Sequence, residues 1–258
     1  SADRGNSWTE RSLPAQVPNA LVSFADDRNG WLASPGSPAT QCTFQSVRLW
    51  RTADGASSWT PLAASGIGNG QCKEALSFVD RSRGFLSAWD PNDAPVIYRT
   101  VDGGQMWAAS RPLPDPPGFT TRAGGFTLRA GAVRAFSDTL LVEAITYVEG
   151  RLRRYVFGST DGGASWTYLA TAPDAQSGLV FATATRWLQI GAPGTFRETT
   201  DGGISWHAFV TDYSQAAPVA PSFVFGDQQI GYATVRGAIQ RTVDGGAHWA
   251  LIATPGTR

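Results

Sequence analysis

Acidic side chains in the loops between predicted strands are the residues of this chain best suited to catalysis. A glycosidase needs two carboxyl groups about 5–10 Å apart, one as acid and one as base or nucleophile. Asp90 and Asp93 share one short segment, and Asp212 lies in another, directly followed by Tyr213. Further loop carboxylates are Asp115, Glu149 and Asp174. Loop carboxylates are also commonly just solvated, so we assign no catalytic residue. The candidate ligand-binding groups of these loops are Asp90, Asp93, Asp212 and Tyr213.

Arginines gather in the middle third of the chain. They are Arg111, Arg122, Arg151, Arg153 and Arg154. A guanidinium pairs with a carboxylate through two parallel hydrogen bonds, so this stretch predicts recognition of acidic protein segments or of sugar carboxylates. The alternative is an ordinary solvated surface. Over the whole chain 21 basic and 21 acidic residues cancel, which argues against nucleic acid or an anionic membrane as a partner.

The cysteines and histidines do not have the spacing typical of a metal centre. Cys42 and Cys72 have no Cys-x-x-Cys neighbour, and the two histidines, His207 and His248, lie far from them in the sequence. We therefore expect neither a metal nor another cofactor. The cysteines are interpreted either as a disulfide, which would indicate an oxidising, extracytoplasmic compartment, or as two free thiols.

A short motif recurs six times and must position all these residues. It has the pattern Ser/Thr-x-Asp-x-Gly-x-x-Trp, with Ala56 in place of the glycine in the second copy. Its aspartates, 40 to 59 residues apart, are Asp3, Asp54, Asp102, Asp161, Asp201 and Asp244. Its tryptophans are Trp8, Trp59, Trp107, Trp166, Trp206 and Trp249.

The motif has the chemistry of a tight turn between two strands. A short carboxylate can accept hydrogen bonds from N–H groups of its own turn, and glycine adopts the positive φ that such turns require. The tryptophan then begins the next strand and inserts its ring between layers. Six copies of a catalytic or metal-binding aspartate would have no purpose, so we interpret these residues as structural.

The segments between the motifs predict antiparallel strands. Apolar runs alternate with polar turns, as in residues 21–33, 75–87 and 222–233, and a third strand precedes each motif. These third strands are predicted over residues 47–51, 96–99, 153–158, 195–198 and 238–241. A composition of 29 Gly, 16 Pro and 10 Trp with a single Met also argues against helix bundles.

Four-stranded units of this length, repeated along a chain, indicate an all-β fold, a β-propeller of antiparallel blades. We predict a single domain over residues 1–258 with five full blades and an extra N-terminal strand over residues 7–13; the alternative is a six-bladed propeller. The repeated motif would form the turn between the third and fourth strands of each blade. The loops between second and third strands, and those between blades, would then share the opposite face, which usually carries function. Cys42 and Cys72 both map to that face on neighbouring blades.

The repeats resemble those of a known family. The segment 78–107, with Phe-x-Asp, Gly-Phe and Tyr-Arg-Thr-x-Asp-Gly-Gly-x-x-Trp, is similar to Asp-box (bacterial neuraminidase, BNR) repeat propellers. Within them it looks closest to the photosystem II assembly-factor-like and sortilin-like repeat proteins. The resemblance covers essentially the whole chain and implies a propeller fold. It says little about activity, because related repeats occur in sialidases, glucan hydrolases and non-catalytic binding proteins.

The sequence favours a binding protein over an enzyme. A sialidase would carry an Arg-Ile-Pro-type segment near its first blade, and the nearest match is Arg111-Pro112 between later blades. We therefore expect a secreted, periplasmic or cell-surface propeller that binds a protein or peptide as an assembly or interaction scaffold, without inserting into a membrane. The alternatives are a glycan-binding or glycoside-hydrolysing propeller, and a structural module of a larger surface protein.

Overall fold

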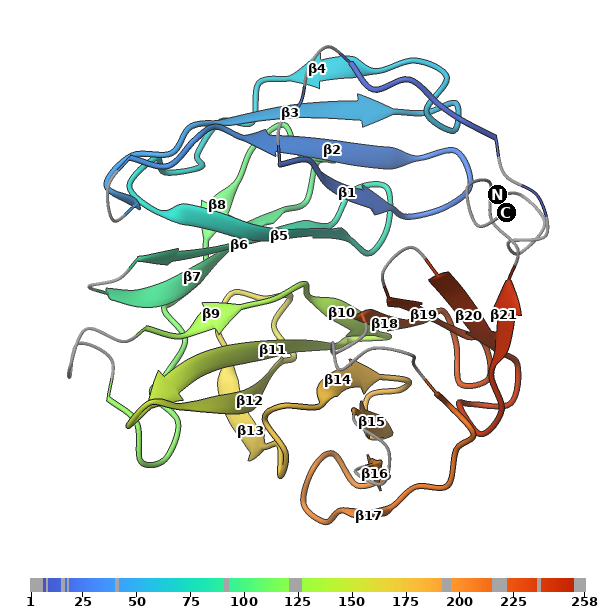
Figure 1. The fold of residues 1–258 in the computed structure, drawn as a ribbon. Coiled ribbons are helices and arrows are strands. Elements are labelled where there is room, and N and C mark those ends of the chain that lie inside the picture. The colour runs from blue at the N-terminus through green and yellow to red at the C-terminus, as the bar shows by residue number, and fades with distance from the viewer. Residues whose placement is uncertain are drawn as a thin grey trace. The chain divides into compact units, whose positions relative to one another are not determined.

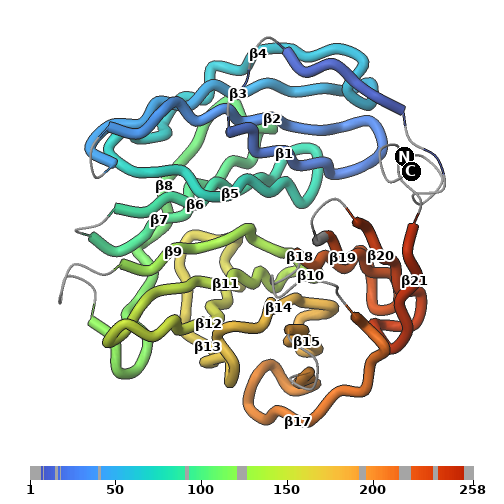
Figure 2. Tube along the Cα trace, viewed as in Figure 1, coloured from blue at the N-terminus to red at the C-terminus, as the bar shows by residue number. Residues whose placement is uncertain are grey.

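A computed structural model gives the fold of the chain. It describes residues 7, 9–14, 17, 19–39, 42–90, 93–120, 127–191, 196–214, 222–235 and 238–252. All regular elements in this part are β-strands, and they form five separate antiparallel sheets (Figures 1 and 2). The sheets are the blades of a five-bladed β-propeller, which confirms the predicted fold class.

The chain divides into two compact units. One consists of residues 11–168 and the other of residues 169–258 together with residues 1–10. The division falls inside one strand, β13 (Thr167–Thr171). The prediction of one domain over residues 1–258 stays a prediction.

The unit of residues 11–168 contains three blades. The first has β1 (Leu21–Phe24), β2 (Gly30–Pro35), β3 (Val47–Thr52) and β4 (Thr60–Leu62), in that spatial order. The second has β5 (Cys72–Phe78), β6 (Gly84–Asp90), β7 (Asp93–Thr100) and β8 (Ala108–Ala109). The third has β9 (Arg129–Ala130), β10 (Arg134–Phe136), β11 (Thr139–Val148), β12 (Arg151–Ser159) and β13.

The third blade departs from the predicted four strands, because its first strand is broken in two. Both β9 and β10 pair with β11, but Ala130 lies opposite Ala144 whereas Arg134 lies opposite Leu141, so the register shifts by one residue between them. A long hairpin, β11 paired with β12, follows in this blade. Glu149 and Gly150 join β11 to β12 with φ values of 50° and 72°, as a type I′ turn requires of its two central residues.

The other unit contains two blades. One is β14 (Gly178–Phe181), β15 (Trp187–Ile190), β16 (Arg197–Thr199) and β17 (His207–Ala208). The other is β18 (Ser222–Phe225), β19 (Gly231–Val235), β20 (Ala238–Thr242) and β21 (Ala250–Ile252). The five third strands predicted from the sequence correspond to β3, β7, β12, β16 and β20.

The expected extra N-terminal strand is not found: residues 9–13 are described and carry no strand. The last blade is completed by β21, which pairs Ala250 with Arg241 of β20. The first copy of the motif, with Asp3 and Trp8, lies outside the described residues.

The five described copies of the motif form the same hydrogen-bonded turn. In the second blade the Thr100 hydroxyl donates to Asp102 Oδ1 at 2.8 Å and accepts from the Gly104 N–H at 3.0 Å. Asp102 Oδ1 also accepts from the Met106 N–H at 3.0 Å, and this bond leads those that lower the pKa of the carboxyl. Equivalent bonds hold Asp54, Asp161, Asp201 and Asp244. These carboxylates are therefore committed to their own turns.

One copy has alanine at a position that favours glycine. Ala56 donates its N–H to the Thr52 hydroxyl at 3.0 Å, as Gly104 does to Thr100, and has a φ of 67°. An L-residue in this left-handed region costs about 1–2 kcal/mol relative to the right-handed one. The turn thus forms in spite of its sequence at this blade.

Candidate binding pocket

A cavity of about 470 Å³ opens in the unit of residues 11–168. Its walls come from the starts of β1, β5 and β9 and from the ends of β2 and β6, so it draws on all three blades of the unit. The loops from β2 to β3 and from β6 to β7 leave the sheets at the same ends. The lining is largely apolar, with Leu21, Pro35, Pro38, Ala39 and Trp89.

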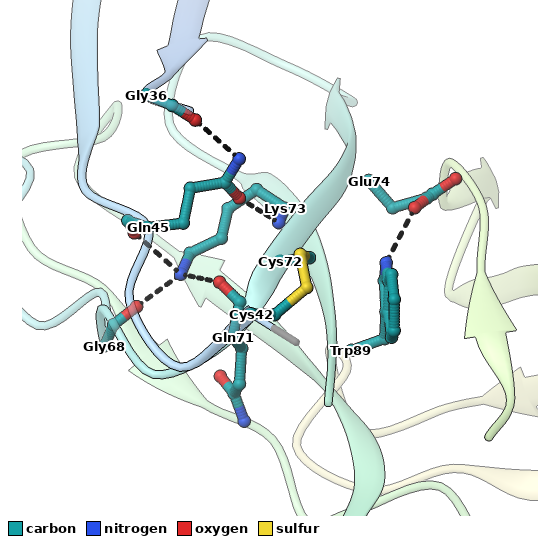
Figure 3. Close-up of a disulfide and its surroundings, with 9 residues drawn as sticks. All are labelled: Gly36, Cys42, Gln45, Gly68, Gln71, Cys72, Lys73, Glu74 and Trp89. Carbon is teal, nitrogen blue, oxygen red and sulfur yellow. Dashed lines mark hydrogen bonds between the residues drawn. A yellow bond between two sulfur atoms is a disulfide. The ribbon is translucent and has the colours of Figure 1, made fainter. Parts of the chain in front are cut away.

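Two register shifts place side chains at the pocket. The pairing of β5 with β6 is irregular between Lys73 and Ala75, which leaves Glu74 as an extra, unpaired residue. The pairing of β6 with β7 is irregular between Ala88 and Asp90, at Trp89. Bulges of this kind re-aim side chains and are frequent beside functional sites. Here Glu74 Oε2 accepts a hydrogen bond from Trp89 Nε1 at 2.9 Å (Figure 3).

Arg129 covers the ring of Trp89. Its guanidinium carbon lies 3.9 Å from the ring centroid, a close cation–π contact. Within the described part of the chain the Arg129 guanidinium forms no hydrogen bond or ion pair. The indole is therefore held at its edge by Glu74 and stacked against a guanidinium whose N–H groups stay available.

A disulfide between Cys42 and Cys72 forms one wall of the pocket (Figure 3). The two Cα atoms are 5.1 Å apart, and both side chains are buried. The bond joins the loop after β2 to the first residue of β5, so it ties two neighbouring blades. This confirms the disulfide interpretation over that of two free thiols.

Lys73, the single lysine of the chain, fastens the same wall from inside. Its side chain is 7% exposed, and Nζ donates to the carbonyl oxygens of Gln45, Gly68 and Gln71. The Lys73 N–H donates to Gln45 Oε1 at 2.7 Å. Burial lowers the pKa of Lys73 to about 8. The ammonium group of Lys73 therefore donates its hydrogen bonds to backbone carbonyls and does not point to a ligand.

The structure describes four of the five predicted arginines, and their surroundings differ. Arg151 and Arg153 are exposed on β12, but Arg154 forms an ion pair with Glu143 on the neighbouring strand. The Arg111 N–H donates to the carbonyl of Ala164, in the repeated turn of the third blade, at 2.8 Å. Arg122 lies outside the described residues.

The predicted acidic candidates also separate. Asp90 and Asp93 face each other where β6 meets β7, next to Trp89. Asp212 belongs to the other unit, where its carboxylate accepts from the Trp249 N–H at 2.8 Å. Tyr213 beside it is 4% exposed and packs against Trp249, and burial raises the pKa of its hydroxyl. Asp90 and Asp93 thus adjoin Trp89 of the pocket lining, within the same unit.

Sequence reasoning did not single out Glu74, Trp89 or Arg129. One signal was present: Trp89 is a tryptophan outside the repeated motif, at the end of a predicted strand and next to a predicted functional loop. Glu74 gave no signal, because its position depends on a bulge. Among the described residues no group of His, Cys, Asp or Glu side chains could hold a metal ion, and no helix is long and apolar enough to cross a membrane.

The chain is similar in sequence to a known protein. No protein-family model matches the chain. The photosystem II assembly lipoprotein Ycf48 of Synechococcus sp. (strain CC9902) is 30% identical over 145 residues, which is 55% of this chain. The match spans 38% of the length of that curated relative.

Solved structures support the fold. A structure described as Ycf48 bound to D1 peptide superposes with a TM-score of 0.50 at 18% identity, covering 92% of this chain and 83% of that one. The α-L-arabinofuranosidase Arb93A of Fusarium graminearum gives a TM-score of 0.56 at 11% identity, with 97% and 87% coverage. An α-L-arabinanase of Penicillium chrysogenum gives 0.53 at 12% identity, with 92% and 81% coverage. At these identities the likeness extends to the fold alone.

Proposed function

We propose that this protein is a non-catalytic, extracytoplasmic β-propeller that binds a peptide segment of a partner protein and serves as an assembly or interaction scaffold. The observation that carries the proposal is the agreement of two comparisons. Ycf48 is similar in sequence over 145 residues, and a Ycf48 structure with the same fold holds a peptide.

The pocket supports this role by its size and lining. A volume of about 470 Å³ lies within the range typical of sites for small ligands. Proline, leucine and tryptophan side chains provide an apolar floor, and Glu74 and Arg129 provide polar groups at known positions. The disulfide and Lys73 hold one wall in place, which lowers the entropic cost of binding.

The same pocket argues against glycoside hydrolysis. Among the described residues its lining contains one carboxylate, Glu74, and that group already accepts the indole N–H of Trp89. Both glycosidase mechanisms need a second carboxyl group at a defined distance. The likeness to arabinan-degrading enzymes is a likeness of fold, so glycan binding is treated as an outcome of the test below.

The extracytoplasmic location is supported by two observations. A disulfide persists in oxidising compartments and is rare in the cytosol. The similar sequence in Synechococcus is named as a lipoprotein. Fractionation of cells that produce the full-length precursor, followed by a thiol count on the isolated protein, tests this part of the proposal.

The binding role is tested with the D1 peptide of the Ycf48 structure and an array of unrelated peptides, beside a glycan array. We expect a specific subset of peptides to bind, and Trp89→Ala to abolish that binding. Trp50→Ala is the matched control, because Trp50 is also partly buried and stacked by an arginine, Arg48 at 5.5 Å, but does not line the pocket. Binding of glycans without binding of any peptide would overturn the proposal.

A further inference from the structure

We propose that the pocket recognises a carboxylate group, which pairs with Arg129 while the guanidinium rests on Trp89. This inference builds on the ligand-binding role proposed above and adds the chemical class of the ligand. It assigns the charge selection to a residue outside the arginine-rich stretch found in the sequence.

The first reason is the state of Arg129. The guanidinium lies 3.9 Å from the Trp89 ring centroid, and it has no hydrogen-bonding or ionic partner in the described structure. Stacking on an aromatic ring fixes the plane of the fork but leaves its N–H groups free at the edge. A carboxylate fits this edge through two parallel hydrogen bonds, and little side-chain freedom remains to be lost on binding.

The second reason is that the other charges of the lining are already used. Lys73 Nζ is surrounded by three backbone carbonyls. Glu74 accepts from Trp89 Nε1 at 2.9 Å and therefore acts as a positioning residue that fixes the ring on which Arg129 rests. Arg129 is thus the group of the lining with charge to offer a ligand, and it selects a negative one.

The third reason is the shape of the lining. Leu21, Pro35, Pro38 and the disulfide present an apolar surface beside the charged edge. The complementary ligand has an apolar body and a carboxylate. In a peptide, that carboxylate belongs either to the chain terminus or to an Asp or Glu side chain next to an apolar residue.

A pair of small probes tests the charge selection without a known peptide. 4-Phenylbutanoate and 4-phenylbutanamide share a body and differ in the carboxylate. The indole N–H resonance of Trp89, assigned with Trp89→Phe, reports binding. We expect a saturable shift with the acid and at least about tenfold weaker binding of the amide, since hydrogen bonds between charged groups are stronger than those to a neutral amide. Equal binding of the two probes would overturn the inference.

Variants assign the effect to Arg129. Arg129→Gln and Arg129→Lys should both weaken binding of the acid, the first by at least about tenfold. Arg48→Gln is the matched control, because it removes the same kind of stacked arginine from Trp50 outside the pocket. Glu74→Gln keeps an acceptor for the indole and removes a negative charge, so binding of the acid should hold or improve. A tenfold loss in Glu74→Gln with no loss in Arg129→Gln would contradict the assignment.

The peptide array separates the two sources of the carboxylate. Peptides are compared as free acids, as C-terminal amides and with Glu or Asp replaced by Gln or Asn. Loss on amidation identifies the chain terminus, and loss on side-chain replacement identifies an acidic residue. Peptides that bind through Trp89 regardless of both changes and of Arg129→Gln would refute the inference but leave the proposed function standing. Binding of the small acid without any peptide would do the reverse.

Discussion

Trp31 and Phe78 stack face to face across the boundary between the first and second blades. Their ring centroids lie 3.7 Å apart with an angle of 2° between the planes. Trp31 is fully buried, and its Nε1 donates to the carbonyl of Gly103, in the repeated turn of the second blade, at 2.8 Å. One side chain therefore joins the packing of two blades to the geometry of a turn.

Replacing Trp31 by Phe should separate these two roles. The variant keeps an aromatic ring against Phe78 but leaves the buried Gly103 carbonyl without its donor and creates a small void. We expect a loss of about 2–4 kcal/mol in the free energy of unfolding, measured by urea denaturation. Trp50→Phe, at a partly exposed ring, should cost under about 1 kcal/mol. Equal losses would show that the Gly103 hydrogen bond is irrelevant.

Ala56→Gly should stabilise the protein, although glycine usually does the opposite. At a φ of 67° the alanine side chain is strained, and glycine removes that strain. We expect a gain of about 1 kcal/mol after subtraction of the extra freedom of the unfolded chain. Ala63→Gly, at an exposed position without positive φ, should lose stability in the same thermal unfolding experiment. A loss in both variants would contradict this account.

Removing the disulfide should lower stability without changing the fold. The bond closes a loop of 30 residues, so Cys42→Ala with Cys72→Ala should cost about 3–4 kcal/mol in the chain-entropy model. The Gln45 and Lys73 hydrogen bonds remain to hold the wall. Circular dichroism should therefore be unchanged at neutral pH while the urea midpoint falls. A midpoint equal to that of the parent protein would show that the loop is held without the bond.

Acid should destabilise the protein through the carboxylates of the repeated turns. Hydrogen bonds from Ser58 and Ser205 lower the pKa values of Asp54 and Asp201 to about 2. The unfolded value is about 3.9, so the stabilisation is complete above that pH and is lost as the pH falls towards 2. Asp201→Asn should flatten this decline in the free energy of unfolding, followed by denaturant titrations at successive pH values.

Asp27→Asn is the control for that titration. The Asp27 side chain is exposed and accepts no hydrogen bond from the described residues, so its removal should leave the slope between pH 4 and pH 2 unchanged. A slope that is the same in Asp201→Asn and in the parent protein would show that the turn carboxylates do not carry the acid sensitivity.

The fold could be predicted from sequence because its determinants are local and repeated. Asp54, Asp102 and the equivalent aspartates accept hydrogen bonds from groups within four residues. One short stretch of sequence therefore determines each turn. The Glu149-Gly150 turn is local in the same sense. The prediction of an extra N-terminal strand was wrong, because a strand needs a pairing partner elsewhere in the chain that its own short sequence does not specify.

The pocket could not be predicted, because its parts are brought together by register and not by proximity in the sequence. Glu74 reaches Trp89 only through a one-residue irregularity in β5, and Arg129 reaches the same ring from a third blade. Arg154 shows that proximity in the sequence can also mislead. In the sequence it stands beside Arg153 and Arg151, yet it faces Glu143 across the sheet and is neutralised there.

The burial of Lys73 has a practical consequence for work on this protein in solution. Amine-directed reagents, such as activated esters and aldehyde fixatives, will find no accessible lysine side chain, because the single ε-amino group is enclosed by three carbonyls. Acylation of Lys73 can occur only when the loop beside the disulfide opens. The rate at which a mild acylating reagent modifies this residue, read by mass spectrometry, is therefore a built-in measure of how often that wall of the pocket comes apart.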